Sequence, residues 1–159
     1  MALIAFTILG EPASKANSRQ IVTIAGRPSS IKSKKARGYE GDALRQIPPV
    51  ARARIEGPVR VTLRIFYASE RPDLDESIVL DVLQDRWSPE KKDRETGIVY
   101  KPRALVQAGV YRNDRQVREK HVFHAVDRRN PRVDIVVEPL QAQQTGLAQE
   151  LFDEAEVQF

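Results

Sequence analysis

The clearest pattern in the chain is an alternation of apolar and polar residues in "GPVRVTLRIFYA", residues 57–68. Every second residue from Val59 to Ile65 is apolar, and the residues between them are two arginines and a threonine. A period of two is that of a β-strand with one buried face. The pattern therefore predicts a strand with one apolar face and one basic face.

Shorter patterns predict further elements on both sides of this strand. Apolar, β-prone runs predict strands, a basic run closed by two prolines predicts a helix, and helical spacing after Pro72 predicts a second helix. The strands are "ALIAFTIL", "IVTIA" closed by "GRPSS", "VREKHVFHAVD" and "RVDIVVEPL"; the helices span 31–47 and the region of Ile78, Val79, Val82 and Leu83. We expect one α/β (α+β) domain over residues 1–140, followed by an acidic tail over 141–159 with one helical turn at "LAQELF".

Residues 86–108, "RWSPEKKDRETGIVYKPRALVQA", interrupt this succession of elements. The segment is charged, is punctuated by Pro and Gly, and suggests a small hairpin around "GIVYK". Long insertions between elements of a compact domain are often functional. We expect this insertion to border the functional site and to be mobile in the free protein.

Composition and charge narrow the function classes. The chain has 159 residues, a formal charge of +4, two histidines and no cysteine. A disulfide framework and a thiolate metal site are excluded, and a histidine zinc cluster is not expected. No apolar run is long enough to cross a bilayer, and the N-terminal segment lacks the features of a secretory leader, so we expect a cytoplasmic protein.

The positive charge is concentrated early in the chain. Residues 15–37 contain seven Lys or Arg residues and no acidic residue. Such a run is typical either of a solvated surface or of a phosphate-binding surface, and the run by itself does not decide between them.

The negative charge is concentrated in "RPDLDESIVLDVLQD", residues 71–85, which contains four aspartates and a glutamate. In an extended segment Asp73 and Asp75 project to the same side, and a chain return would bring Asp114 beside them. Three carboxylates in one place repel each other unless a cation neutralises them, and Mg²⁺ prefers such oxygen ligands. A bound cation of this kind activates water for attack on a phosphodiester.

A plainer interpretation of the same residues stays open. Asp73 and Asp75 also suit the start of a helix, Asp81 and Asp85 suit its solvated face, and Asp114 suits a turn. Spacing alone does not distinguish a metal site from these structural roles.

Two separated motifs resemble one known family. "RPDLD" at the end of the alternating strand, followed by "IVLDVL" and later by "VYRNDRQV", resembles the RusA-type Holliday junction resolvases, including their phage-borne relatives. The N-terminal order, with "EPASKANS" between a strand and a basic helix, is also similar, so that the resemblance covers roughly residues 3–138. It implies a small homodimer with a mixed sheet packed against two main helices.

The resemblance also implies an activity and its residues. It implies magnesium-dependent cleavage of Holliday junctions or other branched DNA, with Mn²⁺ as a possible substitute and no organic cofactor. By motif match, Asp73, Asp75 and Asp114 take the places of catalytic, metal-binding aspartates. Asp81 matches an acidic position in the helix of the family, and Glu76 is a further candidate ligand.

The chain departs from the family at the helix. Glu76 stands where the family has Asn, and the lysine that the family carries in this helix is absent. The cation would have to come from elsewhere, and the main candidates are Lys101 and Lys120, with Lys15, Lys91 and Lys92 as further ones. The absence of this lysine is compatible with reduced activity, with altered specificity and with loss of catalysis.

The resemblance favours phosphate binding by the basic residues of the chain. The expected DNA contacts are Lys15, Arg19, Lys32, Lys34, Lys35, Arg71 and Arg112. Arg71 and Arg112 flank the two acidic motifs and are equally candidates for pairing with the aspartates. Trp87 and Tyr111 are candidates either for stacking on unpaired bases or for packing. His121 and His124, three apart on a predicted strand, point to opposite faces and are expected to be structural.

Three functions follow for testing. The first is a metal-dependent endonuclease of branched DNA that acts as a dimer. The second is a catalytically weakened DNA-binding protein on the same fold, suggested by the missing helix lysine. The third is a partner-binding module whose aspartates are only helix caps.

Overall fold

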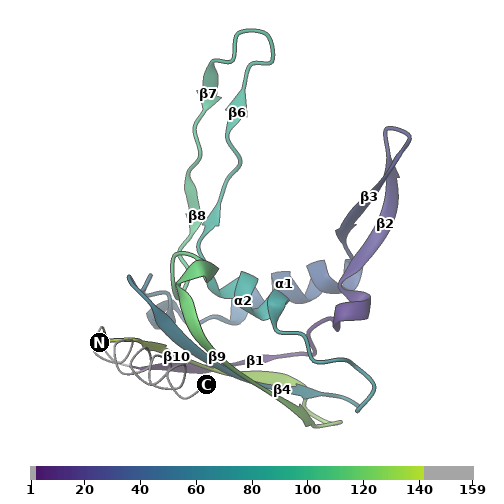
Figure 1. The fold of residues 1–159 in the computed structure, drawn as a ribbon, viewed down its shortest axis with the longest axis vertical. Helices are drawn as coiled ribbons and strands as arrows, with labels where there is room; N and C mark the ends of the chain where they lie inside the picture. The colour runs from purple at the N-terminus through teal and green to yellow at the C-terminus, as the bar shows by residue number, and fades with distance from the viewer. Residues whose placement is uncertain (1–2, 142–159) are drawn as a thin grey trace, which may run out of the picture.

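The computed structural model describes residues 3–141, which form a small α+β domain. Its centre is a four-stranded sheet in the order β1 (Ile4–Leu9), β10 (Arg132–Pro139), β4 (Val59–Tyr67) and β9 (Val117–Val126). β10 pairs antiparallel with both β1 and β4, whereas β9 pairs parallel with β4, so the sheet is mixed. Helices α1 (Lys34–Gln46) and α2 (Ser77–Leu83) lie over one face (Figure 1).

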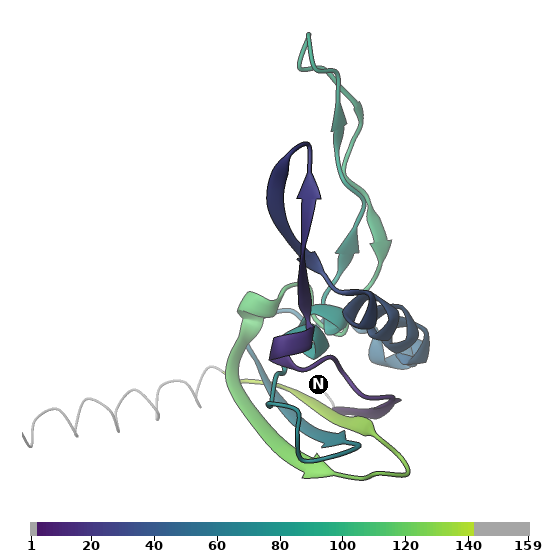
Figure 2. The ribbon, with the colours of Figure 1, turned by 90° about the vertical axis from the view of Figure 1, so that its right-hand side faces the viewer.

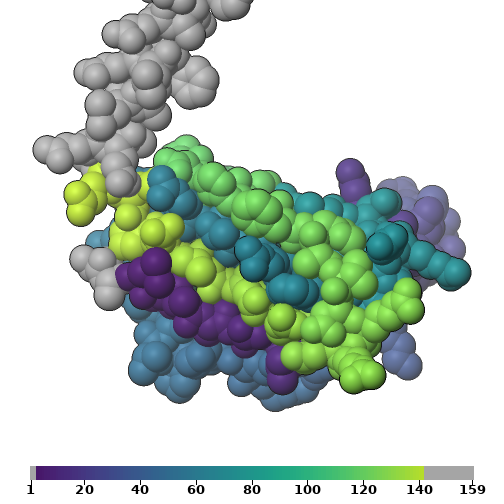
Figure 3. Space-filling model, turned by 90° about the horizontal axis from the view of Figure 1, so that it is seen from below, coloured from purple at the N-terminus to yellow at the C-terminus, as the bar shows by residue number. Residues whose placement is uncertain are grey.

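The alternating strand of the sequence is β4, and its alternation is confirmed. Val59, Val61, Leu63, Ile65 and Tyr67 are all completely buried beneath the helices. The residues between them lie on the outer face of the sheet, where the four strands run side by side in view (Figure 3). Polar pairs such as Arg60 with Glu119, 2.5 Å apart, make this face compatible with water.

Helix α1 begins and ends where its sequence dictates. Ser33 is the N-cap, and its hydroxyl accepts a hydrogen bond from the Ala36 backbone N–H at 3.1 Å. The helix therefore begins three residues later than the predicted position 31, and it ends before Pro48 and Pro49. Its buried residues Ala36, Tyr39 and Ala43 recur every three or four positions, which packs one stripe against the sheet.

Helix α2 is short, and most of its residues pack into the core. Four of its seven residues are buried, namely Ile78, Val79, Val82 and Leu83. They pack in one cluster with the inner residues of β4 and β10. The helical spacing of these residues in the sequence is confirmed.

Two hairpins project from the same side of the domain (Figures 1 and 2). The first pairs β2 (Arg19–Ile24) with β3 (Arg27–Lys32), so "GRPSS", predicted to end a strand, instead begins the return strand. The second, which we call the long hairpin, spans residues 86–107. It contains β5 (Arg86–Trp87), β6 (Lys91–Lys92), β7 (Val99–Lys101) and β8 (Leu105–Gln107), in which β5 pairs with β8 and β6 with β7.

The long hairpin thus includes the small hairpin predicted around "GIVYK" and extends it down to α2. Its predicted mobility stays a prediction. Short 3-10 turns complete the fold at η1 (Lys15–Asn17), η2 (Pro49–Ala51) and η3 (Asp114–Gln116). No helix in the described part of the chain is long and apolar enough to cross a membrane. The predicted helical turn at "LAQELF" lies outside the described residues.

Candidate functional site around helix α2

The segment with Asp73 and Asp75 is fixed by the last residue of β4. The Tyr67 hydroxyl accepts a hydrogen bond from the Asp75 backbone N–H at 3.2 Å and donates to the Asp73 carbonyl at 3.3 Å. Burial raises the pKa of Tyr67, and the nearby charges of Asp75, Glu11 and Glu76 raise it further. The acidic segment is therefore held against the end of the central strand at the start of α2.

Asp75 has a structural role at this position. Its carboxylate accepts hydrogen bonds from the Ser77 backbone N–H at 3.0 Å and from the Ser77 hydroxyl at 2.7 Å. Only 9% of Asp75 is exposed, whereas Asp73 is exposed. Asp75 thus satisfies a free N–H at the start of α2, as the plainer interpretation proposed, and Asp73 is the more accessible carboxylate.

Glu76 forms an ion pair with Lys120, which comes from β9. The hydrogen bond from Lys120 holds the pKa of Glu76 below its usual value, and the positive charge of Lys15 contributes to this shift. Of the two main candidates for the missing cation, Lys120 therefore lies beside the acidic segment. Lys101 lies on β7, in the outer part of the long hairpin and remote from α2 (Figure 1).

Asp114 lies beyond the other end of α2. Its backbone N–H donates to the side-chain carbonyl of Gln84, the residue that follows the helix, at 3.3 Å. Seven helical residues extend about 10 Å, so α2 separates Asp114 from Asp73 and Asp75. Within residues 3–141, no group of three or more His, Cys, Asp or Glu side chains is placed to hold a metal ion. The structure does not bring the three predicted ligands together.

Asp81 lies on α2 between these two ends. Its carboxylate is 3.6 Å from the ammonium of Lys32 and about two-fifths exposed. Burial raises the pKa of Tyr111, and the nearby charges of Asp114 and Asp81 raise it further. Carboxylate oxygens are the donors that Mg²⁺ takes, but these side chains do not form a coordination set as they stand.

Tyr111 cannot stack on bases in this structure. It is completely buried, and its hydroxyl donates to the Leu80 carbonyl at 2.9 Å. Of the two interpretations given for this residue, packing is confirmed. Trp87, by contrast, is 42% exposed, and the guanidinium of Arg103 lies 5.0 Å from its ring centroid.

Asp85 is not on a solvated face, contrary to the sequence-based interpretation. Its carboxylate is almost completely buried, forms an ion pair with Arg54 at 2.8 Å, and accepts from the Gly109 backbone N–H at 2.8 Å. Both partners lie far from it in the sequence. The acidic stretch therefore combines at least one structural carboxylate with others that remain accessible.

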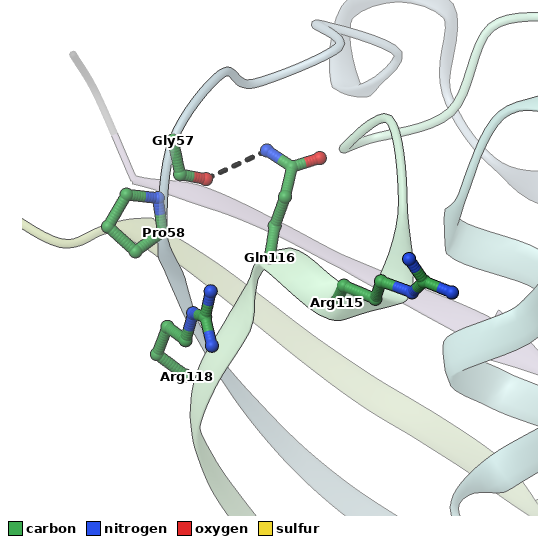
Figure 4. Close-up of a pocket in the computed structure, with 5 residues that line it drawn as sticks. All are labelled: Gly57, Pro58, Arg115, Gln116 and Arg118. Atoms are coloured by element: carbon green, nitrogen blue, oxygen red, sulfur yellow. Dashed lines mark hydrogen bonds between the residues drawn. The ribbon is translucent and has the colours of Figure 1, made fainter.

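Gln116 organises the second motif, and the sequence analysis did not single it out. Asn113 and Gln116 form a capping box around η3, and Gln116 also donates to the Ile55 carbonyl at 2.8 Å. A further hydrogen bond from Gln116 reaches the Gly57 carbonyl at 2.7 Å (Figure 4). The spacing of Asn and Gln is a recognisable signal for such a cap. The adjoining hollow of about 440 Å³ is lined by Arg115 and Arg118 and by none of the predicted acidic ligands.

The predicted DNA contacts are spread over η1, the base of the first hairpin, the start of α1, the loop after β4 and the segment before η3. Lys15, Arg19, Lys34, Lys35, Arg71 and Arg112 are exposed, and Lys32 is partly so. Some of their charge is already paired: Lys32 lies 3.0 Å from Glu40, Lys35 lies 3.8 Å from Glu11, and Arg112 pairs with Glu56. Arg19 and Lys32 line a small pocket beside Ser77 and Asp81 of α2.

The two histidines are placed as the sequence predicted, on opposite faces of β9. His121 stands opposite Thr62, an outer-face position of β4, whereas the ring of His124 lies 5.0 Å from that of buried Tyr67. They do not form a joint ligand pair.

Comparison with protein families finds no family model that matches the chain, and a search of curated proteins finds no matching relative.

Proposed function

We propose that the protein is a RusA-type, magnesium-dependent endonuclease that cleaves Holliday junctions or other branched DNA. The observation that carries this proposal is the placement of the two acidic motifs at the two ends of one short helix, α2. The roots of both hairpins flank that helix, with Lys32 and Arg86 beside it. Acidic residues able to bind a cation thus adjoin basic residues able to bind phosphates.

The side chains around α2 define what this function needs. Asp73 and Asp81 are accessible carboxylates, and Lys120 is a cation that pairs with Glu76 of the acidic segment. Because the carboxylates do not form a coordination set as they stand, cleavage depends on their rearrangement when cation and DNA bind. Action as a homodimer, with one site for each of two strands of a junction, belongs to the same proposal.

A second candidate is a DNA-binding protein on the same fold that has lost cleavage. Two observations favour it: residues 3–141 contain no metal-binding group of three acidic side chains, and Lys120 is already paired with Glu76. This candidate predicts junction binding that weakens steeply with salt, without strand scission in Mg²⁺ or Mn²⁺.

A gel assay with a labelled four-way junction, in Mg²⁺ and in chelator, tests the proposal. We expect Mg²⁺-dependent cleavage that falls at least about 100-fold in Asp73→Asn and in Asp114→Asn, because each removes a negative charge at a cation site. Asp134→Asn is the matched control, since Asp134 lies on the outer face of the sheet and bonds Thr7. Cleavage that survives both substitutions would show that the site is wrongly assigned, and binding without cleavage in the unaltered chain would favour the second candidate.

A further inference from the structure

The long hairpin projects from the domain without contributing to its core. Every residue from Pro89 to Val106 is exposed, and no residue of the hairpin belongs to the hydrophobic cluster. Two-stranded hairpins are only marginally stable by themselves in water. The length of this one (Figures 1 and 2) is therefore not explained by packing of the domain, and its surface chemistry indicates what it contacts.

Its outer half places two positive charges directly opposite each other. Lys91 on β6 is the cross-strand partner of Lys101 on β7. Side chains of directly opposed residues share one face, about 5 Å apart at Cβ, and like charges in such a pair destabilise the hairpin. Among the described residues, neither lysine has an ion-pair partner. An anion bound by both ammonium groups would relieve this repulsion.

The adjacent lysine provides an internal contrast. Lys92 stands across from Val99, beyond a register irregularity that separates it from the pair of Lys91 and Lys101, and it forms an ion pair with Glu90 at 2.9 Å. Among the described residues, the hairpin thus has one lysine whose charge is neutralised by an ion pair and two opposed lysines whose charges are not. A general need for solubility does not explain this difference, because Lys91 and Lys92 are both exposed to water.

The first hairpin repeats the arrangement at its root, where Arg19 is the cross-strand partner of Lys32. There Lys32 has Glu40 and Asp81 as counter-charges, so the repulsion is compensated within the protein. At Lys91 and Lys101 the compensation has to come from outside the described chain.

Aromatic side chains on the long hairpin indicate which polyanion it binds. Tyr100, next to Lys101, is 67% exposed, and exposed Trp87 at the root has Arg103 stacked on its ring. Exposed aromatic rings interleaved with cations suit a chain of phosphates and bases better than an acidic peptide, which has no faces for stacking. We propose that the face of the long hairpin with Lys91 and Lys101 binds the sugar-phosphate backbone of nucleic acid, outside the acidic site at α2.

This inference rests on the proposed function only in taking DNA as the polyanion, and it gives Lys101 a role in binding rather than in catalysis. Its test is therefore a binding measurement without metal. The full-length chain is titrated into a fluorescent four-way junction in chelator, and anisotropy gives the affinity at several salt concentrations.

We expect Lys91→Ala and Lys101→Ala each to weaken binding about 3- to 10-fold and to reduce the slope of log affinity against log salt by about 0.9. The double variant should reduce the slope by about 1.8. Lys92→Ala removes the same charge from the adjacent position and should change affinity less than about 2-fold, because Glu90 already neutralises Lys92. Thermal unfolding by circular dichroism verifies that all variants fold.

Equal losses for Lys92→Ala and Lys101→Ala, or no loss for either, would overturn the inference. Competition by polyglutamate as effective as that by duplex DNA would overturn it as well, since the hairpin would then recognise any polyanion. The two proposals can fail separately. If the chain never cleaves junctions but its variants show the expected salt slopes, the hairpin inference stands and the endonuclease proposal fails. If the unaltered chain cleaves junctions but the double variant binds them normally, the endonuclease proposal stands and the hairpin inference fails.

Discussion

At the scale of single residues, Gly109 is the glycine with the least room for a side chain. A Cβ there would lie 2.4 Å from the Gln84 carbonyl carbon and 2.5 Å from the Leu83 carbonyl oxygen, both backbone atoms that cannot move aside easily. We therefore expect Gly109→Ala to lower the free energy of unfolding by about 3 kcal/mol or more, measured by urea denaturation. Gly38→Ala on α1 is the control, since nothing lies within 4 Å of its Cβ position, and it should be neutral or stabilising. Similar effects of the two substitutions would contradict this account.

The acidic residues show what a sequence can indicate at this scale. The sequence shows the charge cluster of residues 71–85 directly. It also predicts a structural role for an aspartate at the start of a helix, and Asp75 has this role. The sequence does not predict that Asp85 is buried, because its hydrogen-bond partners, Arg54 and Gly109, lie 31 and 24 positions away. Local spacing carries no information about such partners.

At the scale of elements, Glu40 of α1 joins the roots of both hairpins. Its carboxylate lies 3.0 Å from Lys32 of β3 and 2.5 Å from Arg86 of β5. Burial acts to raise the pKa of Glu40, but the hydrogen bonds from Arg86 and Lys32 outweigh it, and the pKa is lowered. The charged carboxylate therefore stabilises the fold at pH above its ordinary pKa of 4.5, and this contribution is lost as the pH falls through the lower pKa of the folded state.

We expect Glu40→Gln to lower the free energy of unfolding at pH 7 by about 1 kcal/mol, since its partners are partly exposed. The difference between the two proteins should shrink as the pH falls from about 5 to 3, because acid removes the same charge in the unaltered chain. Urea denaturation at a series of pH values measures this. Glu95→Gln, an exposed change at the tip of the long hairpin, should show neither effect, and a constant difference for Glu40→Gln at all pH values would contradict the explanation.

Most elements could be predicted because their patterns are local. The period of two in β4 and the apolar spacing in α2 identify their buried faces directly. The strand β3 was missed because "GRPSS" contains the residues of a turn, although Pro28 is tolerated in a hairpin with a solvated edge. The separation of Asp114 from Asp73 and Asp75 was not predicted, because it depends on which end of α2 each loop reaches, and chain order does not specify this.

At the scale of the whole molecule, the domain has two dissimilar sides. One is the outer face of the sheet, with ion pairs such as Arg60 with Glu119 and an arginine, Arg132, 3.8 Å over the ring of Phe66 (Figure 3). The other presents α2 and the two hairpins (Figure 2). The groups proposed to contact DNA all belong to the side with α2 and the hairpins or to loops that adjoin it. The outer face of the sheet therefore has only a structural role in this proposal.

This separation predicts that the long hairpin can be shortened without loss of the fold. Replacing residues 89–103 by Asn-Gly keeps the pairing at the root, where the Ser88 N–H donates to the Ala104 carbonyl at 2.8 Å, and removes no core residue. We expect the free energy of unfolding to change by less than about 1 kcal/mol, because a shorter connection costs little closure entropy. Junction affinity in chelator should fall at least as far as in the double variant of Lys91 and Lys101. A shortened chain that unfolds at a much lower urea concentration would show instead that the hairpin supports the domain, and one that binds the junction normally would remove the hairpin from the interface.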